Sequence, residues 1–489
     1  MAKTIPVLDL AFFLMEKKSS PTHVAALMLF KLPASAGKRF VADLAAAYRK
    51  CIPVPPFNYV PEFPALRMPR WVEADTVDMK YHVRHTALPA SAAYEDFLDL
   101  VAELHTQLLD RKRPCFRAYF IEGLPDRQFA LYAKMHHAIV DGASAIARIT
   151  ASLDESPDAR AVRPFFTIDF GGGAPHATSE RRSALAALKS TAVRQTIAVK
   201  DVYANVLRKS ISRKVLGAGS VPFKAPRAPM NEPIQVGREV ATLSLPLQEM
   251  KAIGKAFGGT LNDVALTIVD AALHRYLGDR SLGLANPLVA LCPLSLREAG
   301  DREATTKASI MFVPLGKRKN RIATRMEHVM QATRSAKAEV LGMGKDAAII
   351  YSLLAFGLSD AAIASGANAV TGPLANFVVS NVPGPRSDLS LGGAKMQAVY
   401  PISGLPAGVG LNVTLISYSD SMDFGFVANA ASMPDLARLA QYTREAFLAL
   451  TRAAARRPIP AAAPRTKSVP TGKSVAAAGG RFASRTLPR

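Results

Sequence analysis

The chain carries His136-His137-Ala138-Ile139-Val140-Asp141-Gly142, in which two adjacent histidines are followed by an aspartate and a glycine. Residues 129–136 alternate with period two, which predicts a strand, and the small residues after Gly142 favour a helix. The histidines therefore lie where a strand passes into a loop. At such a junction a rigid scaffold can aim an imidazole into a cleft, which would suit a fixed general base.

Each part of this stretch also has a purely structural interpretation. A histidine beside an apolar strand is commonly a packed core residue, and Gly142 can simply relieve a turn. Asp141 can cap the following helix by accepting hydrogen bonds from its first free N–H groups. The stretch therefore indicates catalysis only if other segments of the chain support it.

The length and composition are those of an ordinary globular protein. At 489 residues, of which 49% are hydrophobic and 20% charged, the chain is expected to form two domains. Three cysteines, Cys51, Cys115 and Cys292, lie far apart with no CxxC spacing. This pattern predicts a reducing compartment and no zinc cluster.

No segment predicts secretion or a membrane span. Asp9 interrupts the apolar start and no small-residue cleavage site follows, so a signal peptide is not expected. The longest apolar run, Ala347 to Leu358, has about twelve residues, fewer than the roughly 20 that a spanning helix needs. We expect a cytoplasmic protein that is soluble or bound to a lipid surface.

The positive charge is concentrated in two segments. The formal net charge is +22, and residues 180–214 hold nine Lys/Arg against two acidic residues, while residues 456–489 hold eight Lys/Arg and no acidic residue. Basic segments attract nucleic acid, anionic lipid or polyphosphate. No aromatic-studded basic face or zinc-finger spacing supports nucleic acid, so we expect peripheral association with the inner membrane or with lipid inclusions. The predicted helix at 180–215 has a second interpretation, a helix packed on its own domain with a solvated outer face.

Four parts are expected along the chain. They are an N-terminal domain at 1–165, a basic helical linker and Pro-rich connector at 166–235, a C-terminal domain at 236–455, and a disordered basic tail at 456–489. In the C-terminal domain the pattern predicts helices at 247–257 and 261–277, and strands at 240–245, 288–291, 309–313, 377–380, 410–417 and 424–428. Both domains mix strands and helices, which predicts an α/β (α+β) fold.

Six segments occur in a recognisable order. They are Leu8 to Glu16 with Pro21-Thr22-His23-Val24, Asp110 to Phe116, Ile121 to Leu124, the stretch at 136–142, Leu261-Asn262-Asp263-Val264, and Ser380 to Pro385. Together they resemble the bacterial wax ester synthase/acyl-CoA:diacylglycerol acyltransferase family over nearly all of residues 5–450. The resemblance implies two chloramphenicol-acetyltransferase-like domains of the CoA-dependent acyltransferase superfamily, with the active-site channel between them.

The resemblance also implies a reaction. Acyl-CoA would esterify a long-chain fatty alcohol or diacylglycerol, giving a wax ester or triacylglycerol. His137 would take the proton of the acceptor hydroxyl and return it to the CoA thiol, two steps that suit an imidazole pKa near 6.5. No cofactor and no metal are expected, because the thioester of the substrate acyl-CoA is already an activated acyl donor.

Further site residues follow from the resemblance. His136 would shape the loop and set the tautomer of its neighbour, and Asp141 would orient the loop with Arg297 as a structural partner. Asn262 would donate to the oxyanion or position the acceptor, although it can equally be a helix cap. Substrate-binding residues are expected at Gly142, Pro114, Phe116, Asp263, Ser380 and Asn381, although Pro383-Gly384-Pro385 can equally form a turn.

The chain departs from the family pattern in two places. It has Cys115-Phe116 where the family usually has Leu-Trp, and Thr305 to Ser309 lacks the usual Gly-Asn. Asp423-Phe424-Gly425-Phe426 resembles a signature of plant relatives, and we interpret it as a strand. Two alternatives stay open at this point, a condensation-type acyltransferase and a non-catalytic paralogue that coats lipid inclusions. A homodimer is also an option that the sequence leaves open.

Overall fold

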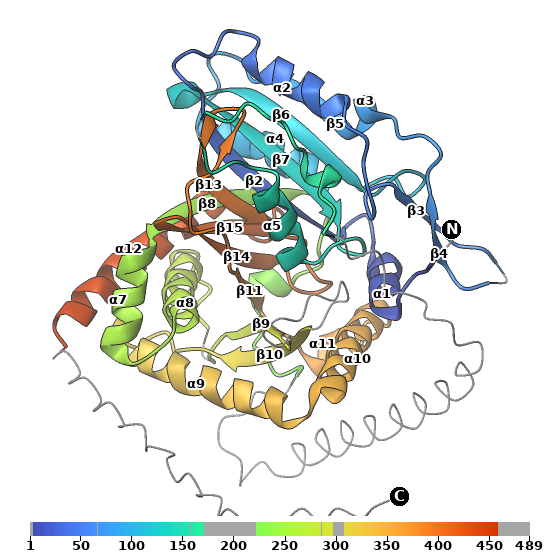
Figure 1. Cartoon of the computed structure of the whole chain (residues 1–489). Helices are drawn as coiled ribbons and strands as arrows, with labels where there is room; N and C mark the ends of the chain where they lie inside the picture. The colour runs from blue at the N-terminus through green and yellow to red at the C-terminus, as the bar shows by residue number, and fades with distance from the viewer. Residues whose placement is uncertain are drawn as a thin grey trace, which may run out of the picture. The chain divides into compact units, whose positions relative to one another are not determined.

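A computed structural model describes residues 3–65, 67–156, 158–170, 222–284, 286–296 and 308–457. The predicted helix at 180–215, Arg297, and the predicted tail beyond Arg457 lie outside these residues. The described chain forms two large mixed layers of strands and helices, as the predicted α/β class requires (Figure 1).

The first sheet has six strands in the order β12-β13-β2-β7-β6-β5, antiparallel except for the β5–β6 pair. Its strands are β2 (His23–Lys31), β5 (Val83–Ala87), β6 (Phe116–Leu124), β7 (Gln128–His136), β12 (Ser390–Leu391) and β13 (Ala394–Ile402). The helices of this half are α1 (Val7–Met15), α2 (Phe40–Arg49), α3 (Met79–His82), α4 (Tyr94–Thr106) and α5 (Gly142–Ala151). The predicted strand at 129–136 and the helix after Gly142 are therefore confirmed.

The alternation along β7 sorts its side chains onto two buried faces. Phe129 and Leu131 join a hydrophobic cluster that includes Tyr48 of α2, whereas Tyr132 joins a cluster that includes Phe97 of α4. Because both faces are covered, β7 is buried along almost its whole length. Its end at His136 is consequently held in a fixed position.

The second sheet has six strands in the order β10-β9-β11-β14-β15-β8. They are β8 (Arg238–Pro246), β9 (Val289–Ser295), β10 (Ala308–Pro314), β11 (Phe377–Val382), β14 (Leu411–Tyr418) and β15 (Ser421–Asn429). The helices are α7 (Leu247–Phe257), α8 (Leu261–Asp279), α9 (Ile322–Gly342), α10 (Lys345–Ala364), α11 (Asn368–Thr371) and α12 (Leu436–Ala455). Every strand and helix predicted for this half is confirmed, including the strand at 424–428.

A segment of the C-terminal half crosses over into the first sheet. β12 and β13 follow β11 in sequence but complete the first sheet, where β13 pairs antiparallel with β2 and Tyr400 lies opposite Leu27. At the junction Asp423 of β15 accepts hydrogen bonds from Ser244 Oγ at 2.7 Å and from the backbone N–H of Val399 at 2.9 Å. The predicted domain limits at 165 and 236 do not describe this exchange, which ties the C-terminal half into the N-terminal sheet.

Helix α10 is longer than the apolar run, Ala347 to Leu358, that the sequence shows in this region. Its segment Ala347–Ala364 is long and apolar enough to cross a membrane, and one third of that segment is buried. The apolar run of the sequence ends at Leu358, and the helix continues past it through Ser359 and Asp360 to Ala364. One face of the helix packs into a cluster with Phe312 and Val378.

A small third sheet lies beside α1. It consists of β1 (Lys3–Thr4), β4 (Arg70–Glu73) and β3 (Tyr59–Glu62), in that order. Phe13 of α1 and Trp71 of β4 share a hydrophobic cluster with Cys115 and Ala138. This cluster holds α1 against the loop that carries the two histidines.

Candidate active site

The stretch at 136–142 joins the end of β7 to the start of α5. Asp141 has an extended backbone conformation, and its Oδ1 accepts a hydrogen bond from the N–H of Ser144 at 2.8 Å. This contact satisfies one of the free N–H groups at the start of α5. The helix-cap interpretation of Asp141 is therefore correct, while its predicted partner Arg297 lies outside the described residues.

His136 is fully buried and its ring is held from both nitrogens. Nδ1 accepts a hydrogen bond from the backbone N–H of Ala138 at 3.1 Å, so the ring proton lies on Nε2. Nε2 lies 3.1 Å from Thr22 Oγ1 and 3.5 Å from Glu16 Oε1. A ring fixed in this way has no free nitrogen for a substrate, and its role in this geometry is to shape the loop.

His137 is the more accessible of the two histidines. Its backbone N–H donates to the carbonyl of Thr22 at 3.0 Å, and its ring stacks on Phe12 with a centroid distance of 4.1 Å and an interplanar angle of 17°. Its side chain is half-buried, and Nδ1 has no hydrogen bond to another described residue. The ring is therefore positioned by stacking and by its backbone. Because Nδ1 is buried, Nε2 is the imidazole nitrogen that can take part in chemistry.

The surroundings of His137 favour the neutral imidazole. Burial lowers the pKa of His137, and the nearby His136 also lowers it, while the ring's own backbone carbonyl and the charge of Asp141 raise it. The net direction is downward from the ordinary value. A neutral imidazole at pH 7 can accept a proton, as a general base must.

The second sheet supplies the opposite wall. The side-chain N–H of Asn381, at the end of β11, donates to Asn262 Oδ1 at 2.7 Å. Val382 reaches Gly142, where an added methyl group would lie 3.7 Å from the Cγ2 atom of the valine. The structure therefore brings the predicted residues Gly142, Asn262 and Asn381 to one place, although they are far apart in sequence.

The start of α8 is capped by Thr260 and not by Asn262. Thr260 is the N-cap, and Asp263 Oδ2 accepts hydrogen bonds at 2.8 Å from both the N–H and the hydroxyl of Thr260. This arrangement is a capping box. The cap interpretation of Asn262 is therefore wrong, and the exposed Asn262 side chain is available for another role. Asp263 is buried, and one of its oxygens is committed to the cap.

The other predicted substrate-binding residues lie apart from the histidines or make no contact with them. Phe116 is fully buried in the first core, where its ring stacks on His82 at 4.5 Å. Pro114 is also buried, and the neighbouring Cys115 carbonyl accepts from the N–H of His136 at 2.9 Å. This segment supports the strand by its backbone, and the geometry gives Phe116 a packing role. Ser380 is half-buried within β11, opposite Thr414 of β14.

Four residues of the site carried no predicted role: Phe12, Phe13, Glu16 and Thr22. They come from α1 and from the segment between α1 and β2, and all four contact the histidines or the groups that hold them. The segment Leu8 to Val24 was part of the family resemblance, which was the available signal. Its local pattern carries no indication that an N-terminal helix lies on the histidines of a distant loop.

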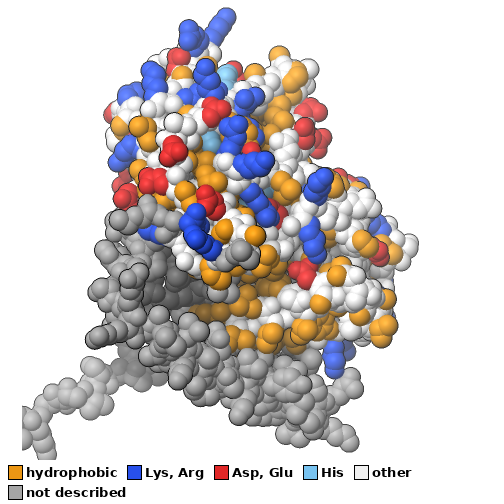
Figure 2. Space-filling view, turned by 90° about the vertical axis from the view of Figure 1, so that its right-hand side faces the viewer, with side chains coloured by type: hydrophobic (Ala, Val, Ile, Leu, Met, Phe, Trp, Pro, Cys, Tyr) orange, Lys and Arg blue, Asp and Glu red, His pale blue; other side chains and the backbone are white. Residues whose placement is uncertain are grey.

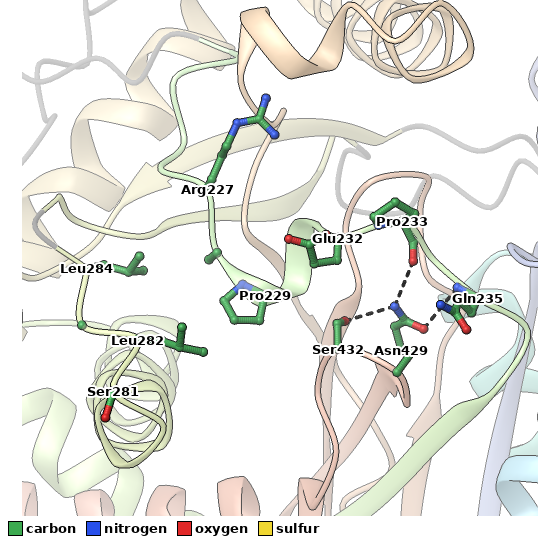
Figure 3. A pocket seen from close by; sticks show the side chains of 13 residues that line it. Arg227, Pro229, Glu232, Pro233, Gln235, Ser281, Leu282, Leu284, Asn429 and Ser432 are labelled. Atoms are coloured by element: carbon green, nitrogen blue, oxygen red, sulfur yellow. Dashed lines mark hydrogen bonds between the residues drawn. The ribbon is translucent and has the colours of Figure 1, made fainter.

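A separate cavity of about 710 Å³ lies at the other end of the second sheet. Figure 3 shows Asn429 on its wall, with hydrogen bonds to Pro233, Gln235 and Ser432. β11 runs parallel to β14 and β15 antiparallel to it, so Asn381 and Asn429 mark opposite ends of the sheet. The cavity is therefore distinct from the histidine site. In the described part of the chain, no group of three His, Cys, Asp or Glu side chains is arranged to hold a metal ion.

Comparison with protein families finds two matching models. The wax ester synthase/diacylglycerol acyltransferase catalytic domain matches residues 6–265, and the WS/DGAT C-terminal domain matches residues 306–451. The O-acyltransferase WSD of Acinetobacter baylyi is 30% identical over 449 residues, which cover 90% of this chain and 94% of that protein. A Mycobacterium tuberculosis protein named "Probable diacyglycerol O-acyltransferase Tgs4" is 32% identical over 463 residues, 92% of this chain and 96% of its own.

Solved structures give the same result at the level of the fold. The wax ester synthase/diacylglycerol acyltransferase from Marinobacter aquaeolei VT8 has a TM-score of 0.73 and 29% identity, over 93% of this chain and 100% of that one. The starter condensation domain of rhizomide synthetase RzmA has a TM-score of 0.56 at 17% identity, over 94% and 96% of the two chains. The second similarity concerns the fold alone.

Proposed function

The chain belongs to the wax ester synthase/diacylglycerol acyltransferase family and is an acyl-CoA-dependent acyltransferase, and we propose that His137 is its general base. The observation that carries this proposal is the combination at His137 of partial exposure, a lowered pKa and a place in the loop whose Gly142 lies against Val382 of the second sheet. His136 holds the loop, and Asp141 caps α5 and contributes its charge.

In the proposed reaction His137 takes the proton of an acceptor hydroxyl as its oxygen attacks the thioester carbonyl of acyl-CoA. A C–O bond forms, the C–S bond breaks, and the proton passes from the imidazolium to the CoA sulfur, which leaves as the thiol. The thioester is an activated donor, so this sequence needs no metal and no further cofactor. The imidazole begins and ends neutral.

We infer a second role for Asn262. Its carbonyl oxygen is occupied by Asn381, so its side-chain N–H group is the part that can point to a reacting carbonyl. A donor placed at the developing oxyanion contributes about 10²–10³-fold to the rate. The exposure of Asn262 and its separation from the helix cap support this role.

The acceptors we propose are long-chain fatty alcohols and diacylglycerol. The names of the matching families and relatives support this substrate class. Thiol release from palmitoyl-CoA, with hexadecanol or a diacylglycerol as acceptor, tests the proposal. We expect turnover by the wild type, loss of at least 10²-fold in His137→Ala, and full activity in His328→Ala, whose histidine is exposed on α9. No thiol release with any long-chain acceptor would overturn the reaction, and retained turnover in His137→Ala would overturn the base.

We further propose that the protein works in the cytoplasm at the surface of the inner membrane or of lipid inclusions. Leu14 of α1, Leu354 and Leu358 of α10 and Val370 of α11 are 72%, 42%, 58% and 91% exposed. Lys17, just after α1, bonds Asp360 of α10 at 3.2 Å, which places these helices side by side. Figure 2 shows hydrophobic side chains gathered in the lower part of the face that α1 and α10 occupy, below a region rich in Lys and Arg.

Flotation with anionic liposomes tests this location. We expect Leu354→Glu/Leu358→Glu to float less than the wild type, and Leu448→Glu, a matched change at a 45% exposed leucine of α12, to float equally well. Deleting residues 456–489, or neutralising the basic residues of 180–214, tests the two basic segments in the same assay. Unchanged flotation in a variant would exclude the segment it alters as an anchor. A homodimer is checked by the mass of the protein in solution.

A further inference from the structure

Helix α1 lies directly against the two histidines. Phe12 stacks on His137, and the next residue, Phe13, stacks on His136 with a centroid distance of 4.2 Å and an interplanar angle of 18°. Two consecutive helical side chains thus cover two consecutive imidazoles. The face of His137 that carries Phe12 is closed to water by this contact, which contributes to the burial that lowers its pKa.

An ion pair between a buried carboxylate and a partly exposed arginine holds the C-terminal end of this helix. Glu16 follows α1, its side chain is 2% exposed, and its Oε2 accepts from Arg111 Nε at 3.1 Å and Nη2 at 2.8 Å. Burial by itself would raise the pKa of Glu16. The contacts with His136, Arg111 and Thr22 outweigh burial and lower this pKa to about 2, so Glu16 is a carboxylate at neutral pH.

The same groups bind the last carbonyls of α1, which have no partner within the helix. Arg111 Nη2 donates to the carbonyl of Phe13 at 2.8 Å, and Thr22 Oγ1 donates to the carbonyl of Phe12 at 3.0 Å. Glu16 Oε1 in turn accepts from the N–H of Thr22 at 3.2 Å. Glu16 therefore joins the two residues that fix the backbone of both stacking phenylalanines.

We propose that Glu16 is a positioning residue, which holds Arg111 and Thr22 so that α1 keeps Phe12 stacked on His137. This inference rests on the proposed role of His137 as the base. An ion pair whose arginine is partly exposed to solvent contributes little net stability. Its directional hydrogen bonds, in contrast, specify one position of α1, and the ring of His137 takes its orientation from that position.

The charged and titratable groups around this part of the loop come from several elements. They are His136 and Asp141 in the loop, Asp9 on α1, Glu16 just after it, Arg111 before β6, and His23 on β2. Removing Glu16 withdraws one negative charge, which by itself would lower the pKa of a nearby histidine. Releasing Phe12 exposes His137 to water, which raises its pKa towards the ordinary value. The proposal predicts that the second effect prevails.

The test compares Glu16→Ala, Glu16→Gln and Phe12→Leu with the wild type. The matched control is Glu327→Gln on α9, far along the chain from the loop, which removes a 2.8 Å ion pair with Arg457. We expect kcat to fall about 10²-fold in Glu16→Ala, with KM for palmitoyl-CoA within about threefold of wild type, because positioning is lost and binding is kept. Glu16→Gln keeps a side chain of the same length with one acceptor oxygen, so its kcat should lie between those of the wild type and Glu16→Ala.

The second measurement is the pKa of His137 by NMR titration of ¹³C-histidine-labelled protein, with the signal identified from His137→Gln. An upward shift in Glu16→Ala and in Phe12→Leu, with none in Glu327→Gln, is the expected result. An unchanged pKa in Glu16→Ala would overturn the proposal, whatever Phe12→Leu shows, as would a fall in kcat that matches the loss of folded protein by circular dichroism. Should Glu16→Ala not fold, Phe12→Leu and Glu16→Gln carry the same test.

The two proposals can fail separately. The titration needs no turnover, so a shifted His137 pKa in an enzyme whose His137→Ala variant stays active would overturn the base and keep the positioning role. Loss of activity in His137→Ala with an unshifted pKa in the Glu16 and Phe12 variants would overturn the positioning role and keep His137 as the base.

Discussion

Gly425 of β15 lies against the backbone of β13 in the first sheet, and its replacement by alanine tests how the two sheets are joined. A methyl group on Gly425 would lie 1.8 Å from the carbonyl oxygen of Pro401 on β13 and 2.8 Å from its carbonyl carbon. Real Cβ atoms do not come closer than 3.0 Å to a neighbour. One of the two strands would therefore have to move by about 1.2 Å.

Neither strand can move easily. β15 is paired on both sides, with β14 and β8, and β13 lies between β12 and β2. Overpacking a well-formed core costs roughly 1–3 kcal/mol, and here the obstacle is backbone instead of a flexible side chain, so we expect about 3 kcal/mol or more. The loss of conformational freedom that alanine imposes on the unfolded chain offsets about 0.4–1 kcal/mol of this.

Urea unfolding followed by far-ultraviolet circular dichroism measures the effect. The matched control is Gly357→Ala in the middle of α10, where nothing lies within 4 Å of the added methyl group. Alanine is a better helix former than glycine by about 1 kcal/mol, so the control should unfold at a higher urea concentration than the wild type. Glycine-to-alanine substitution should therefore destabilise the protein at Gly425 and stabilise it at Gly357.

A Gly425→Ala variant that unfolds at the wild-type urea concentration would refute the close packing of β13 against β15. A variant that is destabilised but retains full acyl transfer would show that the site tolerates a displaced junction. The expected result is a lower unfolding midpoint together with reduced turnover.

Three further predictions concern other parts of the molecule. Arg325→Met leaves the fully buried Asp270 without its cation and should lower the free energy of unfolding by about 3–5 kcal/mol. Thermal unfolding measures this loss. An Arg325→Met/Asp270→Asn protein that is no more stable than Arg325→Met would contradict the prediction. Burial, and then the charge of Asp141, raises the pKa of Asp9 to about 7 from 3.8, so the folded state binds this proton more tightly. The wild type should therefore lose stability relative to Asp9→Asn as the pH rises from about 4 through 7, and urea midpoints that stay equally far apart at pH 5 and pH 8 would oppose this. Asn262→Ala and Asn381→Ala should each lower kcat/KM at least about tenfold, and their double-mutant cycle should show coupling, because the two amides share one hydrogen bond.

Short-range patterns in the sequence predicted the elements well. The strand at 129–136, the helix that Asp141 caps, and the two helices and six strands predicted for the second half follow from alternation, helical periodicity and turn residues. The later helices α9, α10, α11 and α12 were not predicted. These signals lie within about ten residues of each other, so no tertiary contact is needed to recognise them. The pair of His136 and His137 was likewise visible as a candidate base, and the resemblance supplied Asn262 and Asn381 as companions.

Single residues were harder to assign, because one residue type serves several roles. Asn262 and Thr260 are both typical helix caps, and only the folded structure shows that Thr260 and Asp263 share the cap while Asn262 bonds Asn381. Phe116 was predicted to bind substrate because its segment resembles the family's, although Phe replaces the usual Trp. Its burial in the first core is decided by the rings around it. Packing partners that are distant in sequence cannot be recognised from a local sequence pattern.

The sequence by itself thus determined the secondary structure, the mixed α/β class and the loop that carries the histidines, since each depends on neighbouring residues. The exchange of β12 and β13 into the first sheet and the placement of α1 over the loop were decided only by the tertiary structure. Both depend on contacts between segments about a hundred or several hundred residues apart, such as Glu16 with Arg111 and Leu27 with Tyr400. The separation of roles between the two histidines has the same origin, because the burial of His136 and the partial exposure of His137 are properties of the folded chain and not of the motif.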